Sequence, residues 1–232
     1  MPYLDLFLPQ GNEPEIAKEA ARFSIKPIFL YPFVSKKEIL NKKEELKELN
    51  CYVGTYIIPN NLQSIRRLAK LWLLSDFLIV LNPGKYVRAA VNNPKIDAVF
   101  RVPTILGRDF LEYKNSNWNV ILTNIAQKNK ICYGVDLSQI LESDGYPRAK
   151  LLGREAQNIQ LCYRKIPILL ATFAREPWQV KLPENLAAFG RVLGLNVPLS
   201  KAAISKSYED ILRKKEARRK PTFVQPGVEL IE

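Results

Sequence analysis

Seven short apolar runs recur along this chain, and several of them end at a proline. The runs are Tyr3 to Leu8, Pro27 to Phe33, Cys51 to Ile58, Phe77 to Asn82, Ala98 to Val102, Ile131 to Leu137 and Ile168 to Ala174. The prolines are Pro9, Pro32, Pro59, Pro83 and Pro103. Because proline has no N–H for a strand ladder, it marks a credible strand end. Strand-length runs with helix-like stretches between them predict βα units and a parallel sheet rather than a sandwich.

The stretches between the runs predict helices. They are Pro14 to Phe23, Ser35 to Leu49, Asn60 to Leu74, Pro83 to Val91 and Gln139 to Arg164. The second has the signature of a capping box, because Ser35 is followed three positions later by Glu38. Its alternating charges indicate a solvated helix face rather than a binding motif.

The spacing of the runs indicates a barrel. Starts near residues 3, 27, 51, 77 and 98 lie about one βα unit apart, and an eighth strand near Ala202 to Ser205 would close the ring. We therefore expect an α/β, TIM-barrel-like (β/α) barrel of about seven to eight parallel strands, without metal histidines. A single domain over residues 1–206 would be followed by a basic C-terminal helix and tail over 207–232, a segment suited to contact RNA or a partner.

The chain contains no histidine, which removes both the commonest metal ligand and the commonest general base. It has no glycine-rich phosphate loop of either common type, and its three cysteines are too far apart for a zinc knuckle. At the predicted C-terminal strand ends the only carboxylate is Asp136, while Asp5 lies inside the first strand and is expected to be buried and hydrogen-bonded. We therefore expect no metal active site.

Positive charge is concentrated in the middle of the chain. Residues 1–50 hold 8 basic and 8 acidic side chains, whereas residues 51–130 hold 11 basic and 4 acidic ones. The last 52 residues add 10 basic against 6 acidic, and the whole chain carries a net charge of +12. This excess predicts a surface that faces phosphates, as in a nucleic-acid-binding protein. No apolar run is long enough for a membrane span, so we expect a soluble, intracellular protein.

Cations and aromatics occupy the segments where an enzyme barrel would carry acids and histidines. Arginine suits this place in an RNA-binding protein, because its fork matches phosphate oxygens and its plane stacks on bases. One such segment, from Ala174 to Trp178, sets Arg175 beside an aromatic ring. The candidate RNA-binding residues are Arg88, Arg101, Arg108, Arg148, Lys150, Arg154, Arg175, Lys181, Lys201 and Lys206.

Several motifs in the second half of the chain resemble the archaeal ribonuclease P protein component 3 family. They are Ile96 to Val99, Asp144 to Ala149, Arg175 to Leu186, Gly190 to Leu195 and Ser200 to Ser205, and the ending Gly227 to Ile231 is also similar. The resemblance covers roughly residues 75–215 well, and the first 75 residues only by pattern. It is specific because several unlike motifs occur in the family's order.

The resemblance implies a barrel related to those of the polymerase-and-histidinol-phosphatase type but lacking their metal histidines. It implies a role in the endonucleolytic removal of the 5′ leader from precursor tRNA, with hydrolysis performed by the ribonuclease P RNA and its Mg²⁺. The chain itself would bind no cofactor and would be inactive alone. Its partners would be that RNA, precursor tRNA indirectly, the ferredoxin-like component 2 in a two-plus-two heterotetramer, and components 1 and 4. The complex would be cytoplasmic, with no membrane contact.

Four of the candidates, Arg88, Arg148, Lys181 and Lys201, match basic positions of the family, and the other six are chosen by location. Two segments depart from the family pattern. Trp118 and Asn119 stand where relatives often carry an Asp-His pair, and Thr172 to Arg175 replaces a Ser-rich strand end. Two rival functions remain at this point: an independent barrel phosphoesterase with metal-dependent turnover, and a purely protein-binding scaffold without salt-sensitive RNA binding.

Overall fold

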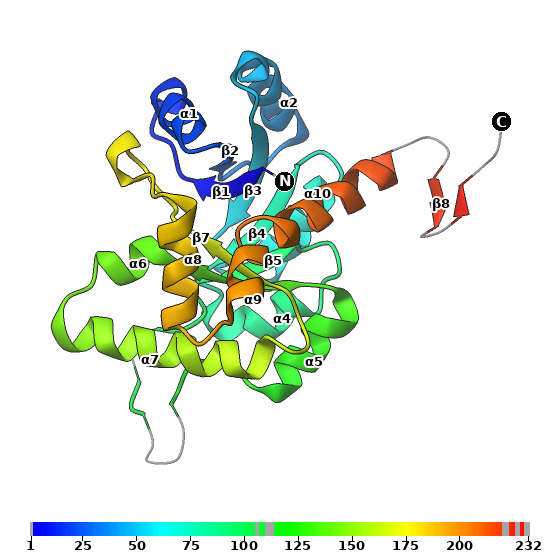
Figure 1. Cartoon of the computed structure of the whole chain (residues 1–232). Coiled ribbons are helices and arrows are strands. Elements are labelled where there is room, and N and C mark those ends of the chain that lie inside the picture. Colours follow the sequence, from blue (N-terminus) through cyan, green and yellow to red (C-terminus); the bar gives the residue numbers. More distant parts are fainter. Residues whose placement is uncertain (1, 105–106, 110–113, 220–222, 226–227, 230–232) are drawn as a thin grey trace.

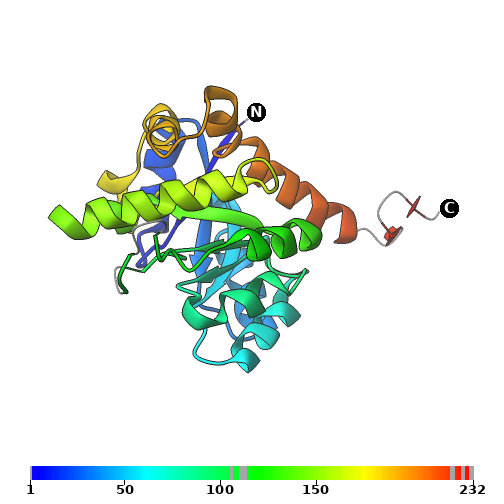
Figure 2. The same cartoon turned by 90° about the horizontal axis from the view of Figure 1, so that it is seen from below.

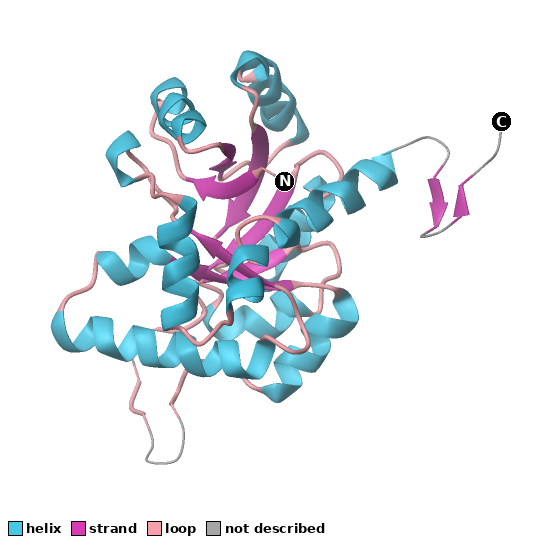
Figure 3. Ribbon diagram, viewed as in Figure 1, coloured by secondary structure: helices cyan, strands magenta, loops and turns pink. Residues whose placement is uncertain are grey.

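Seven parallel strands form one sheet in chain order, from β1 to β7, and the sheet curls into a barrel (Figures 1 and 3). The computed structural model describes residues 2–104, 107–109, 114–219, 223–225 and 228–229. The strands are β1 (Tyr3–Phe7), β2 (Ile25–Tyr31), β3 (Tyr52–Ile57), β4 (Phe77–Leu81), β5 (Ala98–Phe100), β6 (Cys132–Asp136) and β7 (Ile168–Ala171). All seven predicted strands are confirmed, with starts within two residues of those expected.

Helices surround the sheet, as the pattern of βα units predicts. They are α1 (Glu13–Arg22), α2 (Lys36–Glu45), α3 (Leu62–Leu68), α4 (Val87–Val91), α5 (Val120–Asn129), α6 (Leu137–Leu141), α7 (Gly145–Cys162), α8 (Pro183–Val192), α9 (Val197–Ala202) and α10 (Lys206–Arg219). Short 3₁₀ turns are η1 (Lys47–Leu49), η2 (Ala69–Leu71), η3 (Gly84–Tyr86) and η4 (Pro177–Gln179). The predicted cap of α2 is present, because Glu38 N donates to Ser35 Oγ over 3.3 Å.

One predicted helix and one predicted strand are wrong. The single helix from Gln139 to Arg164 is two helices, α6 and α7, because Gly145 has a φ of 52° and breaks the helical path between them. The predicted strand from Ala202 to Ser205 is instead the end of α9 and the turn before α10. Helices α5, α8 and α9 were not expected from the sequence.

The turn after α9 fills the gap that an eighth strand would occupy. Leu4 N of β1 donates to Ile204 O over 3.0 Å, and Leu170 N of β7 donates to Ala203 O over 3.1 Å. Further along, the two edge strands meet directly, since Leu8 N donates to Ala174 O over 3.0 Å. Two carbonyl groups of a turn thus satisfy edge donors that would otherwise remain unpaired.

A buried carboxyl group fastens the two edge strands together. Asp5 Oδ1 on β1 accepts from Thr172 N at 2.8 Å, and Asp5 Oδ2 accepts from Thr172 Oγ1 at 2.5 Å. Burial raises the pKa of Asp5 to about 7, and the hydrogen bonds only partly oppose this. The expectation that Asp5 is a buried, hydrogen-bonded group is confirmed.

The barrel interior is packed with apolar side chains rather than open. Leu6, Ile28, Ile79 and Phe100 contribute to it, and Phe100 lies against the strand position of Gly134. A Cβ at Gly134 would come within 2.3 Å of the Phe100 ring, so only glycine fits there. A second apolar layer lies between the strands and the outer helices.

Helix α10 covers the N-terminal ends of the strands (Figure 2), although the sequence assigned it to a separate basic segment. Tyr208 is buried against the interior and donates its OH to Leu170 O over 2.7 Å. Lys215 is 1% exposed and forms an ion pair with Asp97, while Arg219 Nη1 lies 2.8 Å from Asp76 Oδ1. Lys215 of this basic helix therefore lies inside the protein, and Arg219 is paired with the buried Asp76. The antiparallel pair β8 (Phe223–Gln225) and β9 (Val228–Glu229) follows, and the rest of the predicted tail lies outside the described residues.

Candidate nucleic-acid interface

The C-terminal mouth of the barrel is occupied by an ion pair. Asp136 ends β6 and caps α6, with its Oδ1 accepting from Ser138 N at 2.7 Å, while its Oδ2 accepts from Arg101 Nε. Burial raises the pKa of Asp136, and the Arg101 guanidinium opposes that rise. The same guanidinium lies 5.6 Å from the Phe173 ring. Among the residues that the structure describes, no group of three or more His, Cys, Asp or Glu is placed to hold a metal ion.

Two further candidate cations hold the loop that leads from β5 to α5. Arg154 is fully buried, and its Nη2 donates to Asp109 Oδ1 over 2.7 Å and to Gly107 O over 3.0 Å. Its Nη1 contacts Thr104 O, and Lys150 Nζ donates to Gly107 O over 2.7 Å. Although desolvation favours a higher pKa for Asp109, the hydrogen bonds from the Arg154 guanidinium hold it below its usual value. These two side chains, which were expected to bind RNA from a long helix, lie on α7 and hold the described part of this loop in place.

Arg148 caps the end of α6. Its Nε donates to Ser143 O over 2.6 Å, and its Nη2 donates to Leu141 O over 3.1 Å and to Asp144 Oδ1 over 2.9 Å. A cation at a helix C-terminus satisfies free carbonyl groups and complements the helix dipole. Arg148 is nevertheless partly exposed, so its outer edge remains accessible.

The other six candidates have side chains with no hydrogen bond or ion pair within the described part of the chain. Arg88 lies on α4 and Arg108 in the loop after β5, while Arg175 and Lys181 flank η4. Lys201 lies on α9, and Lys206 begins α10. The ten candidates therefore do not form a single cluster at one rim of the barrel.

A larger basic surface covers three consecutive helices, α3, α4 and α5. Contacts join α3 to α4 and α4 to α5, and none of the three helices contains an acidic residue. We call this surface, with the turns next to its helices, the basic face. Its exposed cations are Arg66, Arg67, Lys70, Lys85, Arg88, Lys95, Lys128 and Lys130. Of these, only Arg88 is among the RNA-binding candidates predicted from the sequence, although the charge excess over residues 51–130 was a signal for the rest.

The described acids within residues 51–130 are paired with cations that lie outside this stretch of the chain. Asp76 is bound by Lys43 Nζ at 2.6 Å and by Arg219 Nη1 at 2.8 Å, and Asp97 is bound by Lys215. Although burial favours a higher pKa for Asp76, Lys43 and Arg219 hold it below its usual value. Because these carboxylates neutralise cations of α2 and α10, they do not offset the charge of the basic face.

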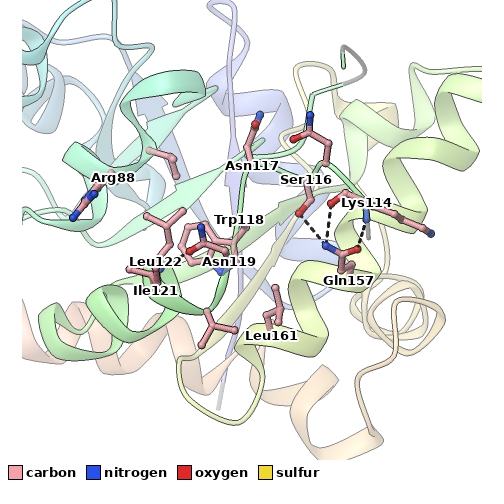
Figure 4. A pocket seen from close by; sticks show the side chains of 13 residues that line it. Arg88, Lys114, Ser116, Asn117, Trp118, Asn119, Ile121, Leu122, Gln157 and Leu161 are labelled. Atoms are coloured by element: carbon pink, nitrogen blue, oxygen red, sulfur yellow. Dashed lines mark hydrogen bonds between the residues drawn. The ribbon is translucent and has the colours of Figure 1, made fainter. Parts of the chain in front are cut away.

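A hollow of about 800 Å³ adjoins the basic face, between α4, residues 114–119, α5 and α7 (Figure 4). Its wall is fixed by Gln157, whose Oε1 accepts from Lys114 N at 2.9 Å and whose Nε2 donates to Lys114 O over 3.1 Å. Arg88 and Lys114 lie on opposite sides of the hollow. Ile121 is 64% exposed at its edge. Two separated cations with amide and apolar groups between them suit a nucleic-acid segment, whose phosphates and bases require both kinds of contact.

Trp118 and Asn119, one of the two segments that depart from the family pattern, have structural roles in this wall. Trp118 is buried, its ring centroid lies 5.0 Å from that of Tyr133, and its Nε1 donates to Thr123 Oγ1 over 2.9 Å. Asn119 caps α5, since its Oδ1 accepts from Leu122 N at 2.9 Å. Asn119 was also the sequence signal that could have revealed α5.

A second hollow, of about 320 Å³, lies between the end of α7 and the start of α10. Lys206 lines it together with Arg164 and Lys165, which sequence reasoning missed. Lys165 Nζ donates to Asn124 Oδ1 over 2.7 Å, and Arg164 Nε donates to Tyr163 Oη over 2.6 Å. The structure thus gathers three cations from two segments that are distant in the chain.

In the described part of the chain, no helix is both long enough and apolar enough to cross a membrane.

Comparison with known proteins gives consistent matches to one family. A family model described as RNase P subunit p30 matches residues 10–220. Ribonuclease P protein component 3 of Methanosarcina mazei is 27% identical over 201 residues, which cover 85% of this chain and 79% of that protein. The protein of the same name from Methanocaldococcus jannaschii is 26% identical over 191 residues, covering 81% and 78%. A chain from a cryo-EM structure of archaeal ribonuclease P with mature tRNA has the same fold, with a TM-score of 0.78 at 22% identity and coverage of 99% and 98%.

Proposed function

The chain belongs to the RNase P subunit p30 family, and from this premise we propose that it is a noncatalytic, RNA-binding subunit of ribonuclease P. In this proposal it binds the catalytic RNA and favours the conformation that removes the 5′ leader from precursor tRNA. The observation that carries the proposal is the basic face, where three adjacent helices expose cations and contain no acid. Such a surface neutralises phosphates along an RNA backbone.

Catalysis is assigned to the RNA with its Mg²⁺, and not to this chain, which binds no cofactor in this proposal. Support comes from the mouth of the barrel, where an enzyme of this fold carries its reactive groups. There the Asp136 carboxylate is already bound by Arg101, and no histidine exists in the chain to act as a base. The ion pair between Arg101 and Asp136 and the packed interior support a structural role for the barrel rather than a catalytic one.

The partners in this proposal are those of the family. The chain would join the ferredoxin-like component 2 in a two-plus-two heterotetramer and act with components 1 and 4 in the cytoplasm. Precursor tRNA would be contacted only through the assembled particle. The barrel would present the basic face to RNA and leave other surfaces for proteins.

Reconstitution with the RNA and component 2 tests the function directly. We expect the purified chain alone not to cleave precursor tRNA, and we expect its addition with component 2 to raise RNA-dependent cleavage at low magnesium. Binding of the chain to the RNA should weaken steeply as salt rises, because bound phosphates release counterions. Cleavage by the protein alone, at a rate unaffected by removing the RNA, would refute the proposal.

A further inference from the structure

An exposed tryptophan lies at the mouth of the barrel, where the fold gives it no structural role. Trp178 in η4 is 74% exposed, whereas the other two tryptophans, Trp72 and Trp118, are buried. A large aromatic ring left in water is unfavourable for an isolated protein, and rings of this kind recur where proteins bind other molecules.

The turn that carries Trp178 is held in place by side chains on both sides. Gln179 Oε1 accepts from Arg175 N at 2.8 Å and from Glu176 N at 3.3 Å, which closes a capping box around η4. Glu176 Oε2 in turn accepts from Asn12 Nδ2 at 3.0 Å, and Val180 is buried below the turn. The ring of Trp178 is therefore presented on an ordered platform, which lowers the entropy lost when a ligand stacks on it.

Trp178 lines a cavity of about 230 Å³ between η4 and α6. The lining residues are Leu137, Ser138, Leu141, Glu142, Thr172, Trp178, Gln179 and Lys181. This volume lies below about 300 Å³, the lower end of the range for pockets that hold whole drug-sized ligands. The cavity is thus suited to one ring system of a larger molecule that continues outside it.

Three polar groups in this lining have no partner within the described part of the chain. They are the carboxylate of Glu142, the side-chain NH₂ of Gln179 and the ammonium group of Lys181. An aliphatic side chain filling the cavity would leave an acceptor and a donor without hydrogen bonds, which is unfavourable when water is displaced. A heterocyclic base offers a flat face, an edge with donors and acceptors, and an adjoining phosphate.

We propose that this Trp178 cavity binds a single unstacked nucleobase of RNA. The base stacks on the Trp178 ring, its edge hydrogen-bonds to Glu142 and Gln179, and Lys181 contacts the neighbouring phosphate. The inference rests on the proposed function, because it adds a base-binding site to a chain that binds the RNA backbone elsewhere. It places this site on the barrel mouth, apart from the basic face.

The test compares two labelled single strands of equal charge, hexa-adenylate and an abasic hexamer, by fluorescence anisotropy with the full chain. We expect the wild type to bind hexa-adenylate about ten-fold more tightly than the abasic strand, in keeping with stacking of one base. Trp178→Ala should remove this preference and leave abasic binding unchanged, while Trp178→Phe should retain most of it. Lys181→Ala should weaken both strands equally. Tyr146→Ala, which removes another exposed aromatic, is the matched control and should bind as the wild type does.

Tryptophan emission provides a second measurement, because Trp178 is the exposed one of the three indoles. Hexa-adenylate should quench it in the wild type, and Trp178→Ala should show no such quenching. Equal, salt-sensitive binding of both strands by wild type and Trp178→Ala would overturn the cavity assignment and leave the proposed function standing. Loss of component 2 binding in Trp178→Ala with RNA binding intact would also overturn it, in favour of a protein contact. Absence of all salt-sensitive RNA binding would refute the proposed function itself.

Discussion

At the scale of single residues, similar cations in this chain have opposite roles. Arg88 projects from α4 without a partner among the described residues, whereas Arg154 is fully buried and holds a loop through carbonyl groups and a carboxylate. The sequence shows both as arginines within predicted helices, Pro83 to Val91 and Gln139 to Arg164. Only burial and the number of hydrogen bonds separate a side chain that is free for RNA from one that supports the fold.

Replacing Arg88 should weaken RNA binding without affecting stability. We expect Arg88→Gln to lower the slope of log K against log salt by about one, because one phosphate contact is lost. Arg22→Gln is the control, since Arg22 lies on α1 in an exposed pair with Glu19. The measurement is RNA affinity over a salt series, with the unfolding midpoint in urea as a check of the fold. An unchanged slope would remove Arg88 from the interface.

Replacing Arg154 should act through stability instead. Arg154→Met keeps the length of the side chain but leaves Asp109 Oδ1 and Gly107 O without their guanidinium donors. We expect the free energy of unfolding to fall by more than the loss of a single hydrogen bond would cause, because several hydrogen bonds of one buried guanidinium are removed together. Lys150→Met removes one hydrogen bond to the same carbonyl and should cost about 1 kcal/mol. Urea denaturation measures both, and equal effects would contradict the role given to Arg154.

At the scale of elements, α10 has the composition of an RNA-binding helix but packs against the barrel. Its composition is that of an RNA-binding tail, with six Lys or Arg between Lys206 and Arg219. In the structure Lys215 and Arg219 bind carboxylates at the strand starts, and Arg218 lies 4.8 Å from the Trp72 ring. Apolar residues on the same helix close the barrel. The helix is therefore part of the core.

The ion pair of Lys215 with Asp97 provides a test of this role. We expect Lys215→Met to lower the free energy of unfolding by about 3 kcal/mol, because it leaves the 3% exposed Asp97 side chain charged and unpaired. The double variant with Asp97→Asn should be more stable than Lys215→Met alone, since the amide oxygen can still accept from Leu78 N. A double-mutant cycle in urea measures the coupling. Strictly additive losses would show that the pair does not hold α10.

At the scale of the whole molecule, the barrel is closed by groups that do not belong to an eighth strand. The carbonyl groups of Ala203 and Ile204 occupy the gap on one side, and the contact between Asp5 and Thr172 joins β1 to β7 beside them. Closure of the sheet therefore depends on a carboxyl group whose pKa is raised by burial.

This closure should make stability depend on pH. The folded state binds the Asp5 proton more tightly than the unfolded state, because the folded pKa is about 7. The free energy of unfolding should therefore fall as pH rises from about 4, the ordinary carboxyl pKa, to about 7, with a slope of at most about 1.4 kcal/mol per pH unit. Asp5→Asn should flatten the part of the profile between about pH 5 and 7. Urea midpoints at several pH values measure this, and a variant profile parallel to that of the wild type would contradict it.

Glu155 extends the same dependence to higher pH. Its pKa is raised to about 8 by burial, against the hydrogen bond that Tyr133 Oη donates to it over 2.7 Å. Glu155→Gln should therefore flatten the profile from about pH 4 to about pH 8, and its effect above pH 7 lies outside the range in which Asp5 titrates. Urea measurements on both variants then separate the pH dependence that comes from barrel closure at Asp5 from the pH dependence that comes from the packing of Glu155 on α7.

The sequence by itself determined the strands, most helices near the N-terminus, the absence of histidine chemistry and the charge excess over residues 51–130, because these follow from local composition and periodicity. It also determined the family, through motifs in a fixed order. Only the tertiary structure decided which cations are free. Arg101, Lys150 and Arg154 find carbonyl or carboxylate partners on other segments, and the acids near the basic face are bound by Lys43, Lys215 and Arg219 from distant helices. The reason is physical: the partners of a side chain depend on which segments pack together, and a local sequence pattern does not specify that packing.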